Sequence, residues 1–368
     1  MGNELKFDFG PGVVAEGYTQ VLDSTVYTEE SGYGFLNPVN VYSRDRGVPG
    51  PLRRSFCIPA GAVFQVAVPS GNYRVEMTIG DQIIGTRTTL KAGEGRLIAK
   101  DLQTNEGEFA VLSFTVHVSD GKLRLAFSGA APRVNAMHIA PAVQVSTLYL
   151  AGDSTVTDQP ADGYPYAGWG QMLPYYFKAD AAVANYAVSG RSSKSFIHEG
   201  RLDVIASQIR KGDYLFIQFG HNDQKMDEER HTSPYTTYKE HLQKYIDAAR
   251  IREAIPILIT PVHRRFFDED GSLRDTHGDY ITAMKELAEE QQVILLDLAA
   301  KSKVLYEQLG AEESKSLFLW AWPGEFPNFP RGAEDNTHFQ ELGAIQIAGL
   351  VVACIREQNI QPLALYLR

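Results

Sequence analysis

The chain has 368 residues, of which 44% are hydrophobic and 22% are charged, a composition typical of a globular protein with more than one core. It carries 35 basic and 45 acidic residues, and the formal net charge of −10 argues against nucleic acid as a partner. No apolar run approaches the roughly 18 residues that a membrane helix needs, so we expect no membrane partner either. The sequence does not indicate an oligomeric state.

The cysteine content and the N-terminal sequence bear on the cellular compartment. The two cysteines, Cys57 and Cys354, lie in different halves of the chain, and Cys354 falls in an apolar helical pattern. We therefore expect two buried free thiols rather than a disulfide. The first ten residues, MGNELKFDFG, show no basic-then-apolar signal peptide, which predicts a cytoplasmic protein for the chain as written. A secreted protein is the alternative if an export leader has been removed.

Residues 1–142 show the pattern of an antiparallel β-sandwich. Alternating or β-rich runs recur at short intervals, and turn sequences at 69–72 and 119–121 separate neighbouring runs. We expect strands at 61–68, 72–80, 108–118 and 122–129, with a closing strand at 133–141. This region is predicted to be a separate, jelly-roll-like domain.

The pattern changes after a short connection at 142–147, and strand-like runs alternate with helical ones over residues 147–368. In the segment 236–252, apolar residues recur at spacings of three and four, as one buried helix face requires. The alternation predicts a three-layer α/β domain with a doubly wound, flavodoxin-like parallel sheet. The expected strands are 147–151, 182–187, 213–220, 255–262 and 293–298, and the expected helices are 203–210, 236–252, 278–292 and 342–357.

Four polar clusters stand out in this second domain, and the first three lie at the ends of predicted strands. Because the carboxyl ends of parallel strands share one edge of a sheet, these clusters can converge. Taken alone, Asp153 and Ser154 could equally cap a helix. The clusters are Gly-Asp-Ser-Thr at 152–155, Asn-Tyr-Ala-Val-Ser-Gly-Arg-Ser-Ser at 185–193, Gly-His-Asn-Asp at 220–223 and Asp-Asn-Thr-His at 335–338.

Together the clusters contain the groups that acyl transfer by a serine requires. Ser154 is the candidate nucleophile and His338 the candidate base. Asp335 is the candidate that orients His338, because their spacing on a turn or a first helical turn puts both on one side. The candidate oxyanion donors are the backbone N–H groups of Ser154 and Gly190 and the side-chain amide of Asn222. Gly190 suits this role because no side chain obstructs its N–H group.

The four clusters resemble the motif blocks of the SGNH, or GDSL-like, hydrolases, whose name-giving positions correspond to Ser154, Gly190, Asn222 and His338. Within that superfamily, the variant GDST, the loop 189–196, the GHND block and the segment 326–339 resemble rhamnogalacturonan acetylesterases. The resemblance covers the α/β half of the chain. It implies removal of acetyl groups from pectic rhamnogalacturonan, with no metal and no organic cofactor.

The N-terminal half resembles the galactose-binding-like sandwiches that accompany pectin-degrading enzymes. The resemblance rests on FDFG at 7–10 and on the segment RVNAMHIAP at 133–141. Such modules often bind sugars or calcium, but no aromatic cluster and no acidic run in this sequence marks either kind of site. We therefore expect an accessory or substrate-shaping domain.

Five further residues are candidates for contact with the substrate. Arg191 and Arg264 could meet an anionic sugar, although Arg264 could equally belong to a solvated basic turn. His221 could line the floor of the site, with a structural hydrogen bond as its alternative role. Trp320 and Trp322 lie in a Pro-rich stretch, where their rings could stack on sugars or simply pack against the protein.

The sequence therefore predicts a serine esterase that removes acetyl groups from a carbohydrate, foremost pectic rhamnogalacturonan, through a covalent acyl-enzyme. Its partner would be an acetylated oligo- or polysaccharide. An SGNH esterase or lipase acting on another ester, such as xylan acetyl, a lipid or a thioester, would keep the chemistry and change the substrate. A non-catalytic sugar-binding protein is the second alternative, and the complete set of site residues speaks against it.

Overall fold

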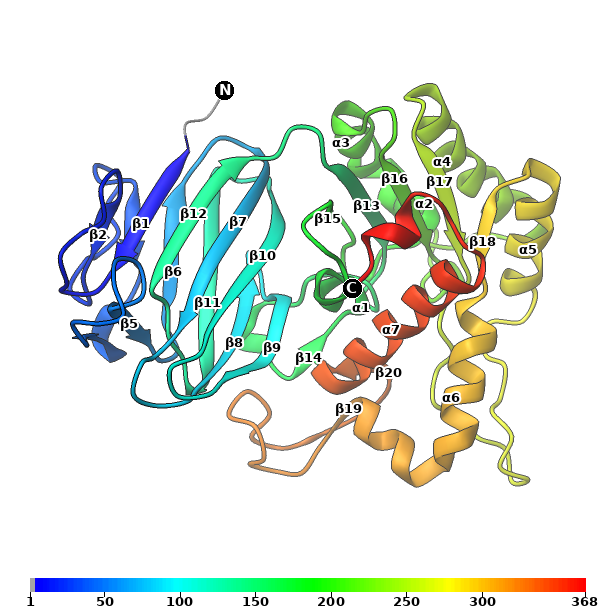
Figure 1. Cartoon of the computed structure of the whole chain (residues 1–368). Coiled ribbons are helices and arrows are strands. Elements are labelled where there is room, and N and C mark those ends of the chain that lie inside the picture. The colour runs from blue at the N-terminus through cyan, green and yellow to red at the C-terminus, as the bar shows by residue number, and fades with distance from the viewer. Residues whose placement is uncertain (1–3) are drawn as a thin grey trace. The chain divides into compact units, whose positions relative to one another are not determined.

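The computed structural model describes residues 4–368, which divide into two compact units (Figure 1). The first unit runs to Val145 and also contains Phe177–Ala182 and Arg368. The second unit contains Ser146–Tyr176 and Val183–Leu367. Within the described part of the chain, no helix is long and apolar enough to cross a membrane. Both cysteines are free and buried, as the sequence predicted.

The first unit is built from two five-stranded sheets, ordered β10-β7-β12-β1-β2 and β3-β6-β11-β8-β9. β1 and β2 pair in parallel, whereas the other recorded pairs in these two sheets are antiparallel. The strands are β1 (Leu5–Phe9), β2 (Thr19–Val21), β3 (Tyr33–Phe35), β6 (Val63–Ala67), β7 (Gly71–Gly80), β8 (Thr86–Ala92), β9 (Arg96–Thr104), β10 (Phe109–Val118), β11 (Lys122–Ala131) and β12 (Ala136–Pro141). A further pair, β4 (Val41–Asp45) and β5 (Ser55–Pro59), forms a two-stranded sheet beyond a short turn, η1 (Pro38–Asn40).

One hydrophobic core joins the two large sheets of the first unit. Residues of β7, such as Val75, and residues of the other sheet, such as Phe64 and Leu125, belong to the same buried cluster. The Phe64 ring contacts the rings of Phe7 and Phe9 edge-on, at centroid distances of 5.4 and 5.1 Å. The predicted antiparallel sandwich is therefore confirmed, with the β1–β2 pair as its one parallel exception among the described strands.

Two long strands of the sandwich, β8 and β9, were not predicted. Their inward positions carry polar residues, which breaks the apolar alternation that identifies a strand in a sequence. Thr86 and Thr104 are both buried, and their hydroxyl groups are hydrogen-bonded to each other at 2.7 Å. The hydrogen bond offsets the cost of burying two hydroxyl groups, so these threonines can occupy core positions.

The second unit is organised around a five-stranded sheet with the order β15-β13-β16-β17-β18 (Figure 1). Taken in chain order within this unit, that arrangement is 2-1-3-4-5, the flavodoxin-like order, and its recorded strand pairs are parallel. The strands are β13 (Ser146–Gly152), β15 (Ala181–Asn185), β16 (Tyr214–Gln218), β17 (Ile255–Ile259) and β18 (Ile294–Leu296). The predicted doubly wound sheet is confirmed.

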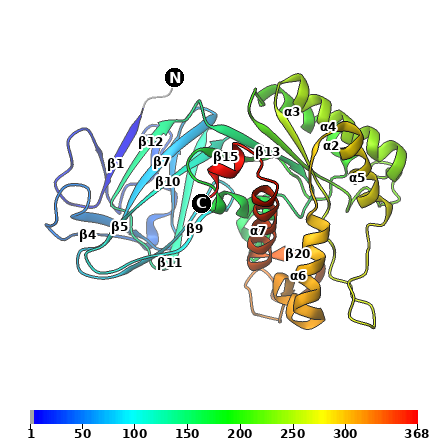
Figure 2. The same ribbon diagram turned by 45° about the vertical axis from the view of Figure 1, so that its right-hand side comes forward.

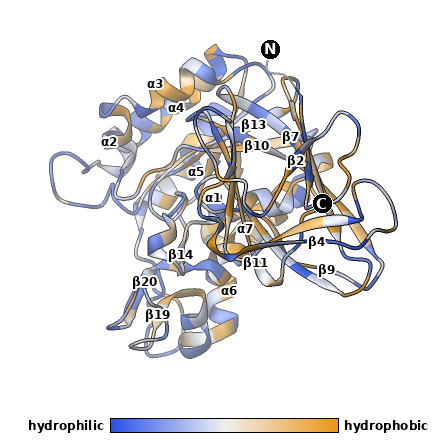
Figure 3. Ribbon diagram, turned by 90° about the vertical axis from the view of Figure 1, so that its left-hand side faces the viewer, coloured by the Kyte–Doolittle hydropathy of each residue, from blue (hydrophilic) through white to orange (hydrophobic). Residues whose placement is uncertain are grey.

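Helices cover both faces of this sheet and complete a three-layer unit (Figure 2). On one face, Tyr149 and Leu215 share a buried cluster with residues of α2, α3, α4 and α5. On the other face, Leu150 lies against Gly170 of α1, and α1 packs on α7. Apolar and polar residues alternate along the outer helices α3 and α4 (Figure 3). The helices are α1 (Trp169–Met172), α2 (Ser193–His198), α3 (Arg201–Gln208), α4 (Lys239–Ile251), α5 (Asp279–Gln291), α6 (Leu298–Glu313) and α7 (Glu341–Glu357).

A small antiparallel sheet in the second unit has the order β14-β20-β19. Its strands are β14 (Tyr166–Ala167), β19 (Phe318–Ala321) and β20 (Ala333–Gln340), and β20 leads directly into α7. Neither this sheet nor α6 was predicted. The remaining short turns are η2 (Ala161–Gly163), η3 (Leu173–Tyr176), η4 (Pro234–Tyr238), η5 (Ser314–Leu317) and η6 (Leu363–Tyr366).

Candidate active site

Ser154 follows β13 at the carboxyl edge of the parallel sheet. All but the first residue of β13 are buried, and Gly152 leaves no room for a side chain. A Cβ atom there would lie 2.7 Å from Val156 Cγ2. Asp153 fixes the next turn, because its Oδ1 accepts hydrogen bonds from the N–H and the hydroxyl of Thr155, at 2.9 and 2.8 Å. Tight packing and this turn together hold Ser154 in place.

A continuous chain of hydrogen bonds links Ser154, His338 and Asp335. Ser154 Oγ lies 2.8 Å from His338 Nε2, and His338 Nδ1 lies 2.7 Å from Asp335 Oδ2. Burial alone would raise the pKa of Asp335, but hydrogen bonding to His338 and the charge of that ring hold it below its ordinary value. An ionised Asp335 can accept a hydrogen bond from the Nδ1–H group of His338. The proton then stays on Nδ1, and Nε2 is free to receive the proton of the Ser154 hydroxyl.

The strand β20 places Asp335 and His338 differently from the sequence prediction. We expected a turn or the first turn of the last helix, but both residues lie within β20, before α7 begins. Trp320 of β19 pairs with Glu334, whereas Phe318 pairs with Phe339, so three extra residues of β20 bulge out of the ladder. Asp335 Oδ1 accepts the N–H groups of Thr337 and His338, at 2.7 and 2.9 Å, and closes the bulge into a turn.

The three candidate oxyanion donors fit their proposed role in different ways. Asn222 follows β16, the strand next to β13, and its amide donates one hydrogen bond to the carbonyl of Arg191 at 3.1 Å. That bond orients the amide and leaves its second N–H for a ligand. Gly190 has φ of +82° and open space where a Cβ would be. Within residues 4–368, the structure records no acceptor for the backbone N–H of Ser154 or Gly190.

Asp223 ties the loop of Gly190 to the loop of Asn222. Its carboxylate is fully buried and accepts hydrogen bonds from the N–H of Ser193, at 3.1 Å, and from the hydroxyl groups of Ser193 and Thr232. Burial raises the pKa of Asp223 to about 7, against the effect of these donors. Asp223 therefore positions the donor loops.

His221 is buried beside Asp153, the residue that precedes Ser154. It is 3% exposed, and its Nδ1 is 3.3 Å from Oδ2 of the buried Asp153. Its ring also contacts the ring of His277 edge-on, at 4.5 Å between centroids. Burial lowers the pKa of His221, which favours the neutral imidazole. The alternative that the sequence left open, a structural role, accounts for these contacts.

Arg191 and Arg264, two candidates for substrate contact, have guanidinium groups that already bind within the protein. Arg191 pairs with Glu199 at 3.0 Å and donates to the carbonyl of Ser189 at 2.9 Å. Arg264 donates to Gln224, at 3.1 Å, and to the carbonyl of His221, at 3.2 Å. The Arg191 charge is therefore paired with a carboxylate, whereas these acceptors of the Arg264 guanidinium are neutral. Contact of either arginine with an anionic sugar stays a prediction.

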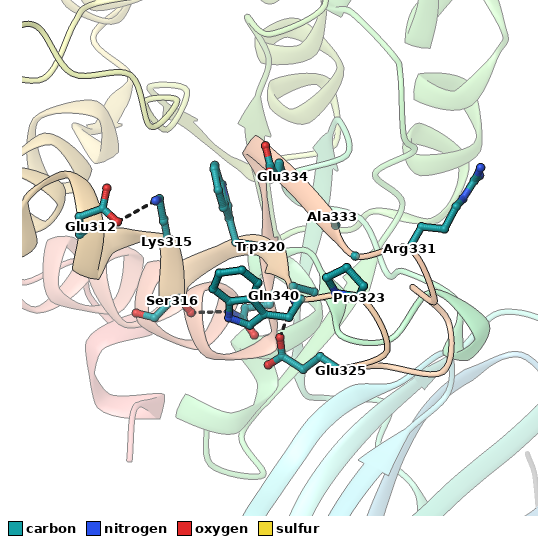
Figure 4. Close-up of a pocket in the computed structure, with 13 residues that line it drawn as sticks. Glu312, Lys315, Ser316, Trp320, Pro323, Glu325, Arg331, Ala333, Glu334 and Gln340 are labelled. Carbon is teal, nitrogen blue, oxygen red and sulfur yellow. Dashed lines mark hydrogen bonds and ion pairs between the residues drawn. The ribbon is translucent and has the colours of Figure 1, made fainter.

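Trp320 and Trp322 have different surroundings although they stand two residues apart. Trp320 donates its indole N–H to Asn336 Oδ1 at 3.0 Å, and cations of Arg265 and Lys315 lie 4.8 and 4.6 Å from its ring. Trp322 is 81% exposed. Both line one surface pocket, which Figure 4 shows.

Sequence reasoning missed Tyr166, which borders the site from β14. Its ring meets the His338 ring edge-on at 5.1 Å, and its hydroxyl lies 3.5 Å from the carbonyl of Ser154. A strand of two residues has no periodicity that a sequence pattern could reveal. Within residues 4–368, no group of three or more His, Cys, Asp or Glu side chains is placed to hold a metal ion.

A bonded Ser-His-Asp set at the carboxyl edge of a flavodoxin-like sheet is the arrangement of serine hydrolases. Residues 150–344 match the GDSL-like Lipase/Acylhydrolase family, and the chain belongs to that family. Residues 5–139 match a second family, described as Beta-agarase/YXIM esterase-like, galactose-binding domain-like.

Several relatives from Bacillus subtilis are similar to this chain. Rhamnogalacturonan acetylesterase RhgT is 52% identical over 213 residues, which cover 58% of this chain and 90% of that protein. A protein described as the uncharacterized esterase YxiM is 30% identical over 374 residues, covering 96% of this chain and 91% of its own length. The crystal structure of YxiM matches with a TM-score of 0.54 at 28% identity, covering 98% of this chain and 99% of that one.

Proposed function

We propose that this protein is a carbohydrate acetylesterase whose substrate is acetylated rhamnogalacturonan. The observation that carries the chemistry is the hydrogen-bonded chain from Ser154 through His338 to Asp335. The substrate is supported by the names of two relatives, RhgT and the probable rhamnogalacturonan acetylesterase YesY, the latter 43% identical over 214 residues. Each of the two alignments covers 58% of this chain.

In the acylation half of the reaction, His338 Nε2 takes the proton of the Ser154 hydroxyl while Oγ attacks the carbonyl carbon of the acetyl group. The carbonyl oxygen becomes an oxyanion, which the N–H groups of Ser154 and Gly190 and the amide of Asn222 stabilise. When the tetrahedral intermediate collapses, the bond to the sugar oxygen breaks. His338 then gives its proton to that oxygen, so the sugar leaves as an alcohol and the acetyl group stays on Ser154.

Deacylation follows the same path with water as the nucleophile. His338 Nε2 takes a proton from water, the hydroxyl oxygen attacks the acetyl carbon, and the bond to Ser154 Oγ breaks as His338 returns the proton to it. Acetic acid is released and ionises at neutral pH. Asp335 stays ionised throughout and stabilises the imidazolium that forms in each half.

We assign residues 1–142 an accessory role and residues 147–368 the catalytic role. The assignment is supported by the separate buried core of the first unit and by its match to a galactose-binding-like family. Acyl chemistry needs none of the side chains of this unit, because the candidate residues run from Ser154 to His338. Its contribution would be to the affinity for the polysaccharide.

Release of acetate from a panel of acetylated polysaccharides tests the substrate. We expect rhamnogalacturonan to be deacetylated faster than acetylated xylan or homogalacturonan at equal acetyl content. Faster release from xylan would contradict the proposed substrate and leave the serine chemistry standing. A protein that released acetate from none of them, and that a serine-directed phosphonate did not label at Ser154, would contradict the enzyme itself.

A further inference from the structure

A pocket of about 820 Å³ opens beside the hairpin of β19 and β20 (Figure 4). Its walls come from the end of α6, from η5, from both strands and from the loop that joins them. The mechanism uses none of its lining residues. Because β20 also carries Asp335 and His338, the pocket and the candidate active site share one strand.

Trp322 is the most exposed aromatic side chain among the described residues, at 81%. Its backbone forms a local turn, in which its N–H donates to Glu325 Oε2 at 2.9 Å and its carbonyl accepts the N–H of Glu325 at 3.0 Å. A large apolar ring held out into water loses the stabilisation that burial would give it. Such an exposed ring, held in a hydrogen-bonded turn, can stack against a ligand with an apolar face.

The polar groups around Trp322 decide which ligand fits. Carboxylates outnumber cations, and Lys315 is already paired with Glu312 at 2.7 Å. An anionic sugar would meet net repulsion here, whereas the hydroxyl groups of a neutral sugar can donate to carboxylates and accept from cations. The charged lining residues are Glu312, Glu325 and Glu334 against Lys315 and Arg331.

We propose that this pocket is a subsite for a neutral pyranose ring of the same polysaccharide whose acetyl group reaches Ser154. The ring's C–H face stacks on the Trp322 indole, and its hydroxyl groups bond to the polar rim. Trp320 forms a wall of the subsite and not its stacking surface. Its indole N–H is bonded to Asn336, and the cations of Arg265 and Lys315 already lie over its ring. The proposal rests on the proposed function and adds that recognition extends beyond the acetylated sugar.

Binding of deacetylated rhamnogalacturonan oligosaccharides to the full-length Ser154→Ala protein tests the subsite without any turnover. Adding Trp322→Ala should weaken the affinity measured by calorimetry about tenfold, while Trp322→Phe should recover most of it. Tyr235→Ala is the matched control, because Tyr235 is 48% exposed on η4 and does not line the pocket. Its affinity should equal that of the parent. Thermal unfolding checks that all variants fold.

Two further outcomes separate this proposal from its alternatives. Homogalacturonan oligosaccharides, in which every ring carries a carboxylate, should compete poorly, and strong competition would overturn the choice of a neutral ring. Equal affinities of the parent and Trp322→Ala would overturn the subsite, even where wild-type protein releases acetate from rhamnogalacturonan. Failure of the wild type to release that acetate would overturn the proposed function first, and the subsite with it.

Discussion

Arg265 holds Asn336 by two hydrogen bonds at once. The backbone N–H of Arg265 donates to the Asn336 carbonyl at 2.8 Å, and its guanidinium Nε donates to Asn336 Oδ1 at 2.9 Å. Asn336 lies between Asp335 and His338 in the bulge of β20. Arg265 itself is 7% exposed and also donates to the carbonyl of Ala311. The bulge is thus attached from outside to the segment that follows β17.

We expect Arg265→Met to lower kcat on 4-nitrophenyl acetate about tenfold, because Asn336 Oδ1 loses the guanidinium, one of its two side-chain donors, and small displacements of a catalytic group are costly. Arg265→Lys keeps the positive charge and loses the planar set of guanidinium donors, so its kcat should lie between those of wild type and Arg265→Met. Steady-state kinetics with this small ester measures the effect. Arg274→Met is the control, because Arg274 pairs with Asp268 on the surface. Equal kcat values for wild type and Arg265→Met would show that the bulge keeps its conformation without the Arg265 guanidinium.

Ser154→Ala should abolish nearly all esterase activity, with a loss on the order of 10⁴-fold or more in kcat. The fold should remain, because the substitution removes a hydrogen bond to His338 and no apolar core contact. Acetate release measures the loss of activity, and circular dichroism checks that the fold remains. Ser193→Ala tests a neighbouring serine whose hydroxyl binds Asp223. A loss as large as that of Ser154→Ala would contradict the assignment of the nucleophile.

Asn222→Ala should lower kcat by about 10²–10³-fold with little change in KM, because an oxyanion donor acts on the charge that develops in the transition state. The same variant also frees the carbonyl of Arg191, so Asn222→Asp is a useful companion. That substitution keeps the size of the side chain and places a negative charge at the oxyanion. Its kcat should fall further than that of Asn222→Ala, and the reverse order would remove Asn222 from this role.

The lowered pKa of Asp335 predicts how its contribution to stability depends on pH. A carboxyl group with a folded-state pKa below its unfolded value, near 3.8, stabilises the fold above that value and loses the effect as pH falls through the folded pKa. The difference in Tm between wild type and Asp335→Asn should therefore be full above about pH 5 and shrink at lower pH. Thermal unfolding from pH 2.5 to 7 measures it. A difference that grows as pH falls below about 4 would contradict a stabilising, ionised Asp335.

The sequence was informative where apolar runs and polar clusters alternate. Ser154 and Asn222 could be placed because each follows a buried strand, and neighbouring parallel strands bring their carboxyl ends together. The bulge of β20 could not be foreseen, since its three extra residues are defined only by the register of β20 against β19, which no periodicity within either strand reveals. The hydrogen bonds of the Arg191 and Arg264 guanidinium groups within the protein could not be predicted either. Their acceptors, Glu199 and Gln224, have no sequence pattern that ties them to these arginines.

The two carboxylate oxygens of Asp335 bind different groups. Oδ1 closes the bulge through the N–H groups of Thr337 and His338, while Oδ2 holds the imidazole. Local folding and proton transfer therefore depend on one side chain of one length. Glutamate would carry its carboxylate one methylene too far to close the turn, and asparagine would present an amide to either the turn or the ring. Neither selection nor design can improve one task at this position independently of the other, so the residue is a shared constraint on both.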